Sequence, residues 1–216
     1  MTWESVMQGQ FSDAHVSDID VAPDNEEVVF AATFNYGMLR SLDGGKSWER
    51  INQGLARDKE IISVTIHPSN PEIIYAGMFT GGVYRSDNGG DSWNHSSIGL
   101  IPEAIISSIA IDQNNPDILY AADQFTGVYR SQDGGQSWEP YSENLQFRAV
   151  NRLELSADSA HLYAATEGGG VYRRDLAGYP PEIIGSSESD PGSSTENMEN
   201  NEQTQGTEVD NDDAGG

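Results

Sequence analysis

The sequence predicts an all-β protein of the β-propeller class, with about four blades of four antiparallel strands each. The first observation is spacing: all four tryptophans of the 216-residue chain lie 45 residues apart. Self-similarity at such a period is typical of solenoids and propellers, in which one supersecondary unit is repeated. The second observation is that three tryptophans end the same phrase. The tryptophans and phrases are Trp3, then SLDGGKSW ending at Trp48, SDNGGDSW ending at Trp93 and SQDGGQSW ending at Trp138.

Short apolar runs recur around each phrase and predict the strands, which we call A to D in chain order within each blade. In the second repeat we expect strands over residues 61–66, 73–78, 82–86 and 92–96. Such runs are rich in valine, isoleucine and tyrosine and are bounded by glycine, proline, asparagine or aspartate. This pattern indicates strands rather than helices. Four antiparallel strands per repeat describe a propeller blade.

The repeated phrase is expected to form the tight turn between strands C and D. Glycine tolerates the positive φ that such a turn requires. The Asp or Asn before it accepts hydrogen bonds from backbone amides of the turn. The tryptophan then packs a large apolar ring beside its own blade. We therefore expect a structural role for Ser41, Asp43, Gly45, Trp48, Ser86, Asn88, Gly90, Trp93, Ser131, Asp133, Gly135 and Trp138.

The phrase, of the form S-x-D/N-x-G-x-x-W, resembles the Asp-box, or BNR repeat. This repeat occurs in sialidases, sortilin-type receptors, xyloglucan-cleaving hydrolases and photosystem II assembly factors. The resemblance covers about residues 3 to 175. It implies a β-propeller built from Asp-box turns. It does not imply an activity, because enzymes and non-enzymes share the repeat and function must be argued from the site.

The two ends of the repeat predict how the ring closes. The opening residues TWESVMQG align with SWERINQG, and so form a D strand without A, B or C before it. The fourth repeat has strands A, B and C but no D strand with a tryptophan. We expect residues 3–8 to pair with residues 170–173 and close a four-bladed monomer, which removes exposed sheet edges. The alternatives are a fragment of a larger propeller and half of an eight-bladed homodimer.

Composition divides the chain into a propeller over residues 1–178 and an acidic, low-complexity tail over residues 179–216. From Gly185 onward the tail has nine acidic residues and no Lys or Arg, so we expect it to be disordered. The formal net charge is −24, and −15 remains without those nine charges. An acidic body disfavours nucleic acid, whose phosphates bind clustered Lys and Arg. Anionic membrane surfaces are disfavoured for the same reason.

The compartment is left open by the sequence. There are no cysteines, which excludes disulfides and thiolate metal sites. No apolar stretch is long enough for direct insertion into a membrane, and the first ten residues lack the basic and apolar regions of a signal peptide. The family resemblance instead implies an extracytoplasmic protein. We therefore expect either export or a cytoplasmic relative of exported proteins.

The repeats differ most in their D–A and B–C connections, which share one face of a propeller. Aromatic and arginine side chains concentrate there, and exposed side chains of these types suit a sugar face, an anionic group or a partner loop. The alternative is that the phenylalanines fold inward, because Phe is commonly buried. The candidate ligand-binding residues are Phe34, Tyr36, Phe79, Phe125, Arg57, Arg148 and Arg152.

A catalytic alternative rests on two carboxylates. Asp123 and Glu167 lie at corresponding connections of neighbouring repeats, and glycoside hydrolases use a carboxylate pair about 5 to 9.5 Å apart. The resemblance makes a sialidase-like or xyloglucanase-like activity conceivable, yet both families use larger propellers. The four histidines occupy different repeat positions and lack the spacing of zinc ligands. We expect no metal and no cofactor.

The sequence thus favours a non-catalytic binding or scaffolding propeller that recognises a protein or a glycan through its D–A and B–C loops. Two alternatives stay open. One is a glycoside hydrolase, and the other is an assembly factor for a membrane protein complex, as the resemblance to photosystem II assembly factors implies.

Overall fold

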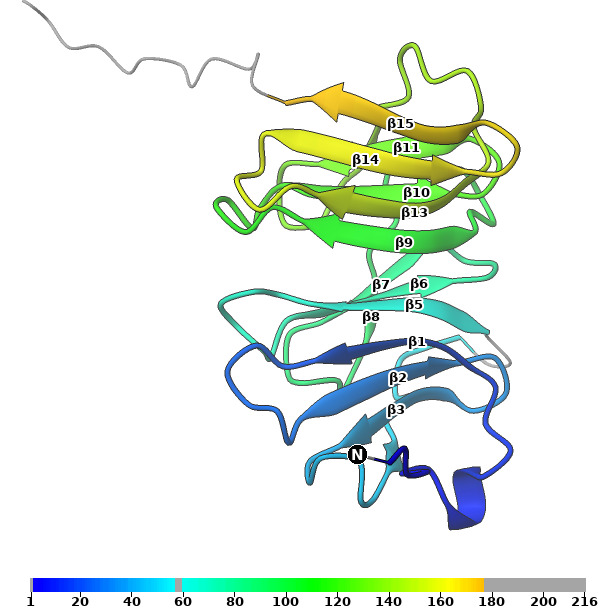
Figure 1. Ribbon diagram of the computed structural model, residues 1–216, viewed down its shortest axis with the longest axis vertical. Helices are drawn as coiled ribbons and strands as arrows, with labels where there is room; N and C mark the ends of the chain where they lie inside the picture. Colours follow the sequence, from blue (N-terminus) through cyan, green and yellow to red (C-terminus); the bar gives the residue numbers. More distant parts are fainter. Residues whose placement is uncertain (1, 57–59, 177–216) are drawn as a thin grey trace, which may run out of the picture. The chain divides into compact units, whose positions relative to one another are not determined.

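The sheets of the protein follow the repeats of its sequence, one antiparallel sheet for each copy (Figure 1). The computed structural model describes residues 2–56 and 60–176, all within one compact unit. Within every sheet, strands adjacent in the chain are adjacent in space. The predicted all-β blades are therefore confirmed, and the single helical element among the described residues is the short 3-10 helix η1 (Gly9–Phe11).

Three of the four blades are four-stranded, and the fourth has three strands among the described residues. Each D strand is only two residues long. In chain order the blades consist of β1 (Val16–Val21), β2 (Val29–Thr33), β3 (Gly37–Ser41) and β4 (Glu49–Arg50); β5 (Ile61–Ile66), β6 (Ile74–Met78), β7 (Val83–Ser86) and β8 (Asn94–His95); β9 (Ile106–Ile111), β10 (Leu119–Asp123), β11 (Gly127–Ser131) and β12 (Glu139–Pro140); and β13 (Val150–Leu155), β14 (His161–Thr166) and β15 (Gly170–Asp175).

The hydrophobic core lies between successive blades. Between blades 1 and 2, Phe30 of β2 joins Ile74 of β6 and Trp93 in one buried cluster. Blades 2 and 3, and then 3 and 4, meet through clusters of the same kind. The A strands lie side by side in the order β1, β5, β9, β13 (Figure 1). Each blade is therefore stabilised mainly by the apolar surface it shares with its neighbours, as expected of repeat proteins.

The glycine-rich turns also connect the blades. In the second turn, the buried Ser86 hydroxyl donates to Asn88 Oδ1 (2.9 Å) and accepts from the Gly90 amide (2.9 Å). The Trp93 indole N–H donates to the carbonyl of Ile51 in the preceding blade (2.7 Å). The tryptophan was expected beside its own blade, but it bridges two blades because its ring reaches back over the D strand before it.

The expected closure of the ring is wrong. Residues 2–8 form no strand and do not pair with β15, which is the edge of its sheet among the described residues. They lie instead against blade 1, where Trp48 Nε1 donates to the Val6 carbonyl (3.1 Å). Blades 1 and 4 lie at opposite ends of the row of sheets (Figure 1). Residues 2–8 and β15 of one chain are therefore not brought together. This arrangement agrees with the alternative expectation of a larger ring.

Candidate binding face

The B–C connections of the four blades are held in place by a common hydrogen bond. The first residue after strand B donates its backbone N–H to the residue just before strand A. This bond joins Phe34 to His15 (3.0 Å), Phe79 to Glu60 (2.9 Å), Gln124 to Ile105 (3.1 Å) and Glu167 to Ala149 (2.8 Å). Since the backbone is fixed in the same way each time, the blades differ at this edge chiefly in their side chains.

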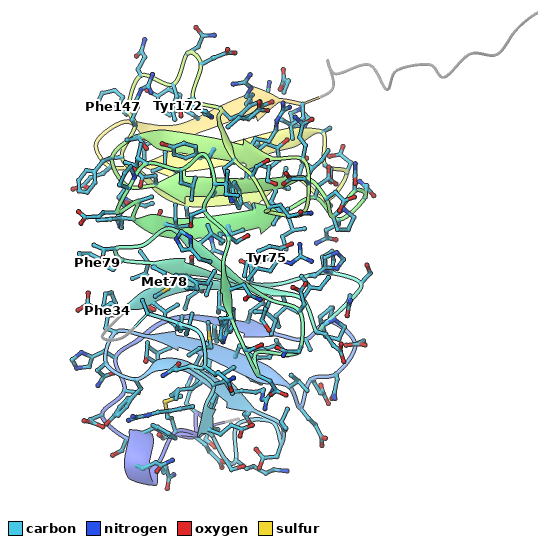
Figure 2. The ribbon with its side chains drawn as sticks, turned by 180° about the vertical axis from the view of Figure 1, so that it is seen from behind. Phe34, Tyr75, Met78, Phe79, Phe147 and Tyr172 are labelled. Atoms are coloured by element: carbon cyan, nitrogen blue, oxygen red, sulfur yellow. The ribbon has the colours of Figure 1, made fainter. Side chains whose placement is uncertain are left out.

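All three predicted phenylalanines are exposed on these connections. Phe34 and Phe79 come from blades 1 and 2, and their rings meet edge to face with centroids 6.5 Å apart. Figure 2 shows both at the same side of the molecule. Phe125, on the connection of blade 3, is 70% exposed. The alternative expectation, that these rings fold inward, does not fit this exposure. We call Phe34, Phe79 and Phe125 the aromatic face.

Tyr36 belongs to a different environment. Its hydroxyl donates to Asp13 Oδ1 (2.6 Å), which lowers the pKa of Asp13 and raises that of Tyr36. Its ring packs edge to face on Phe11, and the guanidinium of Arg50 lies 4.4 Å from the ring centre. These contacts tie residues 9–13 to blade 1. The side chain thus has a structural use that its position in the sequence did not indicate.

The two predicted arginines that the structure describes, Arg148 and Arg152, do not form one cluster. Arg57 lies outside the described residues. Arg148 is exposed, and its guanidinium lies 3.4 Å from the carbonyl of Thr126, next to Phe125. Arg152 lies on β13 and pairs with Glu154 (3.6 Å) along a hollow between the A strands. Of Arg148 and Arg152, only Arg148 lies beside the aromatic face.

A fourth phenylalanine, which is not among the predicted site residues, lies on the same side. Phe147, on the connection before β13, is exposed, and its ring lies 6.5 Å from that of Tyr172 (Figure 2). A Cβ on Gly169 would come within 2.5 Å of Phe147 Cγ. The glycine run of the fourth B–C connection, TEGGG, was the available signal, because it leaves room for an aromatic ring from the neighbouring connection.

The two carboxylates of the catalytic alternative have different environments. Asp123 is buried, with Oδ2 accepting from the Ile105 amide (2.8 Å). Its Oδ1 accepts from the amides of Phe125 and Thr126 and from the Thr126 hydroxyl. Glu167 is exposed. Both oxygens of Asp123 are therefore occupied in bracing the B–C connection, which leaves the group poorly placed for proton transfer.

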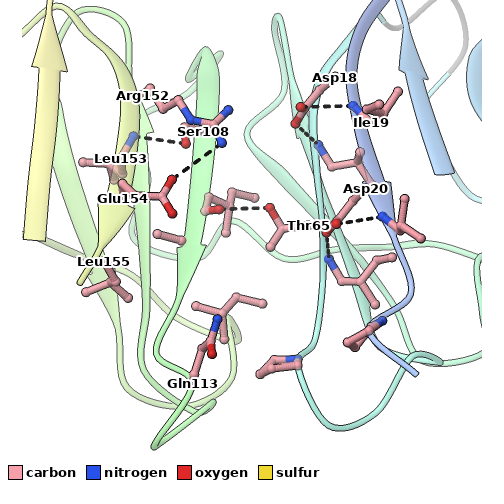
Figure 3. A pocket seen from close by; sticks show the side chains of 18 of the residues that line it. Asp18, Ile19, Asp20, Thr65, Ser108, Gln113, Arg152, Leu153, Glu154 and Leu155 are labelled. Atoms are coloured by element: carbon pink, nitrogen blue, oxygen red, sulfur yellow. Dashed lines mark hydrogen bonds and ion pairs between the residues drawn. The ribbon is translucent and has the colours of Figure 1, made fainter. Parts of the chain in front are cut away.

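A hollow of about 350 Å³ lies between the A strands (Figure 3). Side chains there bond to the backbone of the next A strand. Asp18 accepts from the Val64 amide (3.0 Å), and Asp20 accepts from the Ile66 amide (2.8 Å). Desolvation raises the pKa of Asp20 despite this bond. These polar groups are engaged in joining blades.

Neither a metal site nor a membrane-spanning helix is present in the described ranges. Residues 2–56 and 60–176 contain no group of three His, Asp or Glu side chains that could hold a metal ion. No helix in the same ranges is long and apolar enough to cross a membrane.

The fold and its turns define a protein of the BNR type, built from β-propeller blades. The family described as "Sortilin, neurotensin receptor 3" (Sortilin-Vps10) matches residues 2–174. The chain therefore belongs to the Sortilin-Vps10 family. No curated protein matches the chain.

Solved structures share this fold. An ancestral GH74 enzyme is 26% identical, with a TM-score of 0.58 over 69% of this chain and 21% of its own. The GH74 enzyme of Niastella koreensis is 22% identical, with a TM-score of 0.62 over 75% of this chain and 29% of its own. YCF48 bound to D1 peptide is 16% identical, with a TM-score of 0.56 over 77% of this chain and 50% of its own. The chain thus spans between about a fifth and a half of these proteins.

Proposed function

We propose that this chain is a non-catalytic binding module that recognises a protein partner through its aromatic face, with Arg148 at the border of that face. The observation that carries the proposal is the exposure of phenylalanine on three successive B–C connections, whose backbones are otherwise held alike. Exposed apolar side chains gathered on one face are typical of interaction sites. Packing of the fold does not explain these exposed rings, because the blades pack on one another through the buried clusters between them.

The kind of side chain favours a protein over a glycan. Phenylalanine has no polar group with which to bond sugar hydroxyls, whereas aromatic rings and arginine are common at the centre of protein interfaces. The body of the chain is acidic, so a basic segment of the partner would be attracted to it. YCF48, which has this fold, binds the D1 peptide, so propellers of this kind can hold a peptide.

The other proposed functions have less support. A glycoside hydrolase would draw on the resemblance to GH74 enzymes, but the bonded, buried Asp123 is a poor acid or base. A role in the assembly of a membrane protein complex is a special case of protein binding. An extracytoplasmic location fits membership of the sortilin family and would give the face access to exported partners.

Selection on a random peptide library displayed on phage, with a glycan array run in parallel, tests the proposal. We expect peptides to be enriched and the double variant F34S/F79S to weaken the selected peptide at least about 10-fold, as interface anchors do. The control is Leu42→Ser, which removes an exposed apolar side chain from the C–D turn of blade 1. Enrichment of glycans alone, or equal binding by F34S/F79S and L42S, would refute the assignment.

A further inference from the structure

The first and last blades expose surfaces that the inner blades bury. Ile19 of β1 is 62% exposed, whereas Val64 and Ile109, its equivalents in blades 2 and 3, are 3% and 6% exposed. At the other end, Val171 of β15 is 72% exposed, whereas its equivalent Val83 is fully buried. Val64 is covered by the blade before it, and Val83 by the blade after it. The two ends therefore expose the two complementary halves of one repeated interface.

The polar groups at the two ends are complementary in the same way. The hydroxyl of Ser17 joins blade 1 to blade 2 by donating to the carbonyl of Ile61 (2.7 Å), and that of Ser107 joins blade 3 to blade 4 by donating to the carbonyl of Val150 (2.7 Å). The equivalent donor on β13 is Asn151, which is exposed. The equivalent acceptor on β1 is the carbonyl of Val16. Blade 4 of another chain, placed before β1, would complete this bond as it is completed between blades 1 and 2 and between blades 3 and 4.

Residues 2–8 occupy the position of a D strand from a preceding blade. The bond from Trp48 to Val6 repeats those from Trp93 to Ile51 and from Trp138 to Ser96, both of which reach the chain next to a D strand. Blade 4, in turn, shows no D strand among the described residues. The N-terminal segment is therefore placed to serve as the D strand of a blade that docks on blade 1.

The repeat also gives the register in which β15 would pair with residues 3–8 as a D strand. In blades 1 and 3, strand C pairs with strand D through Arg40 opposite Glu49 and Arg130 opposite Glu139, and both pairs form ion pairs, of 2.8 and 2.5 Å. The equivalent residue on β15 is Arg173, and the equivalent residue in the N-terminal segment is Glu4. Arg173 and Glu4 are both exposed.

We propose that a second copy of this chain covers these surfaces, with blade 4 of each copy docked on blade 1 of the other. Residues 3–8 of each copy then form the D strand of blade 4 in the other, with Glu4 opposite Arg173. Contacts of this head-to-tail kind close only for particular numbers of subunits. Two copies make a ring of eight blades, within the usual range of four to eight, and three copies would exceed it. The hollow between the A strands becomes the central channel of the ring.

Cysteine cross-linking of the full chain tests this proposal cleanly, because the chain has no cysteine of its own. Residues directly opposite in an antiparallel pair lie within the distance that a disulfide spans. We expect E4C/R173C to form a disulfide-linked dimer under mild oxidation. The matched control is E4C/E72C, whose second cysteine lies on an exposed turn of an inner blade, and which should stay a single chain on the gel.

Each other outcome counts against the proposal. A disulfide within one chain would show that residues 3–8 close their own ring, and no linkage above the control would show that the ends do not meet. A ladder of longer species would contradict closure by two copies. Light scattering on the unsubstituted chain should show twice the 23.5 kDa of one chain, and I19D/V171D should reduce that mass by half.

Discussion

The two faces of the blades contrast in what the repeats keep and what they change. On the C–D side, three turns repeat one set of bonds, in which a buried serine hydroxyl accepts from the amide of the second glycine. On the B–C side, the backbone bond is shared but the side chains change from blade to blade. Repetition therefore marks what holds the blades together, and the variation under a constant backbone is where we propose that a partner is recognised.

The side of the blades that carries the C–D turns, here called the turn side, also accepts Asn in place of Asp without a change of geometry. Asp43 and Asp133 accept from the amides of Ser47 and Ser137 (2.8 and 2.9 Å), and Asn88 accepts from that of Ser92 (2.9 Å). The carbonyl oxygen of Asn88 takes the place of a carboxylate oxygen. The turn thus requires an acceptor at this position rather than a charge.

The largest expected effect comes from the turn side. Trp138 is buried, and its indole N–H donates to the Ser96 carbonyl (2.8 Å). We expect Trp138→Ala to lower the free energy of unfolding by about 3 to 5 kcal/mol, through the cavity it leaves. Phe125→Ala, on the loop side, should change it by less than about 0.5 kcal/mol because the ring is exposed. Urea unfolding measures both. Equal losses would remove the contrast between the two faces.

A smaller loss of stability is expected when the turn keeps its tryptophan but loses its serine hydroxyl. Ser86→Ala leaves the buried Gly90 amide without its acceptor, which should cost about 1 to 3 kcal/mol. Ser69→Ala, at an exposed A–B turn of the same blade, is the control and should be nearly neutral. If the two variants unfold at the same urea concentration, the serine bond does not hold the turn.

The smallest effect concerns charge and pH. The hydroxyl and the amide of Ser47 both donate to Asp43 and lower its pKa to about 2. Because this pKa lies below the unfolded value of about 3.9, the stabilisation is complete above pH 4 and is lost as the pH falls towards 2. Asp43→Asn should remove this part of the pH dependence, which urea unfolding between pH 5 and pH 2 measures. In the reverse change, Asn88→Asp should add such a dependence to the second turn.

Much of the fold was predictable because it depends on local pattern. The strands of the second blade were expected over 61–66, 73–78, 82–86 and 92–96, and are found at 61–66, 74–78, 83–86 and 94–95. Alternation and turn chemistry decide such elements within a few residues of chain. The placement of Phe34, Phe79 and Phe125 on connections also followed from the repeat, but their exposure did not, because the sequence left an inward orientation open.

The candidate site was predictable only in part, because side-chain direction depends on neighbours distant in sequence. Tyr36 lies in the same connection as Phe34, but Asp13 and Arg50 hold it to blade 1. Arg152 follows the connection that carries Arg148, yet a strand position directs it into the hollow. Phe147 reaches the exposed side because Gly169, in another connection, leaves space for its ring.

The sequence by itself determined the blade, its period and its turns, since each depends on interactions within about 45 residues that every copy repeats. Only the tertiary structure decided which blade surfaces meet. The alignment of residues 3–8 with a D strand was only partly confirmed: these residues form no strand, but Trp48 bonds to Val6 as Trp93 and Trp138 bond to the chain beside a D strand. Which blade receives them depends on the curvature summed over all blade interfaces, and no local pattern carries that sum.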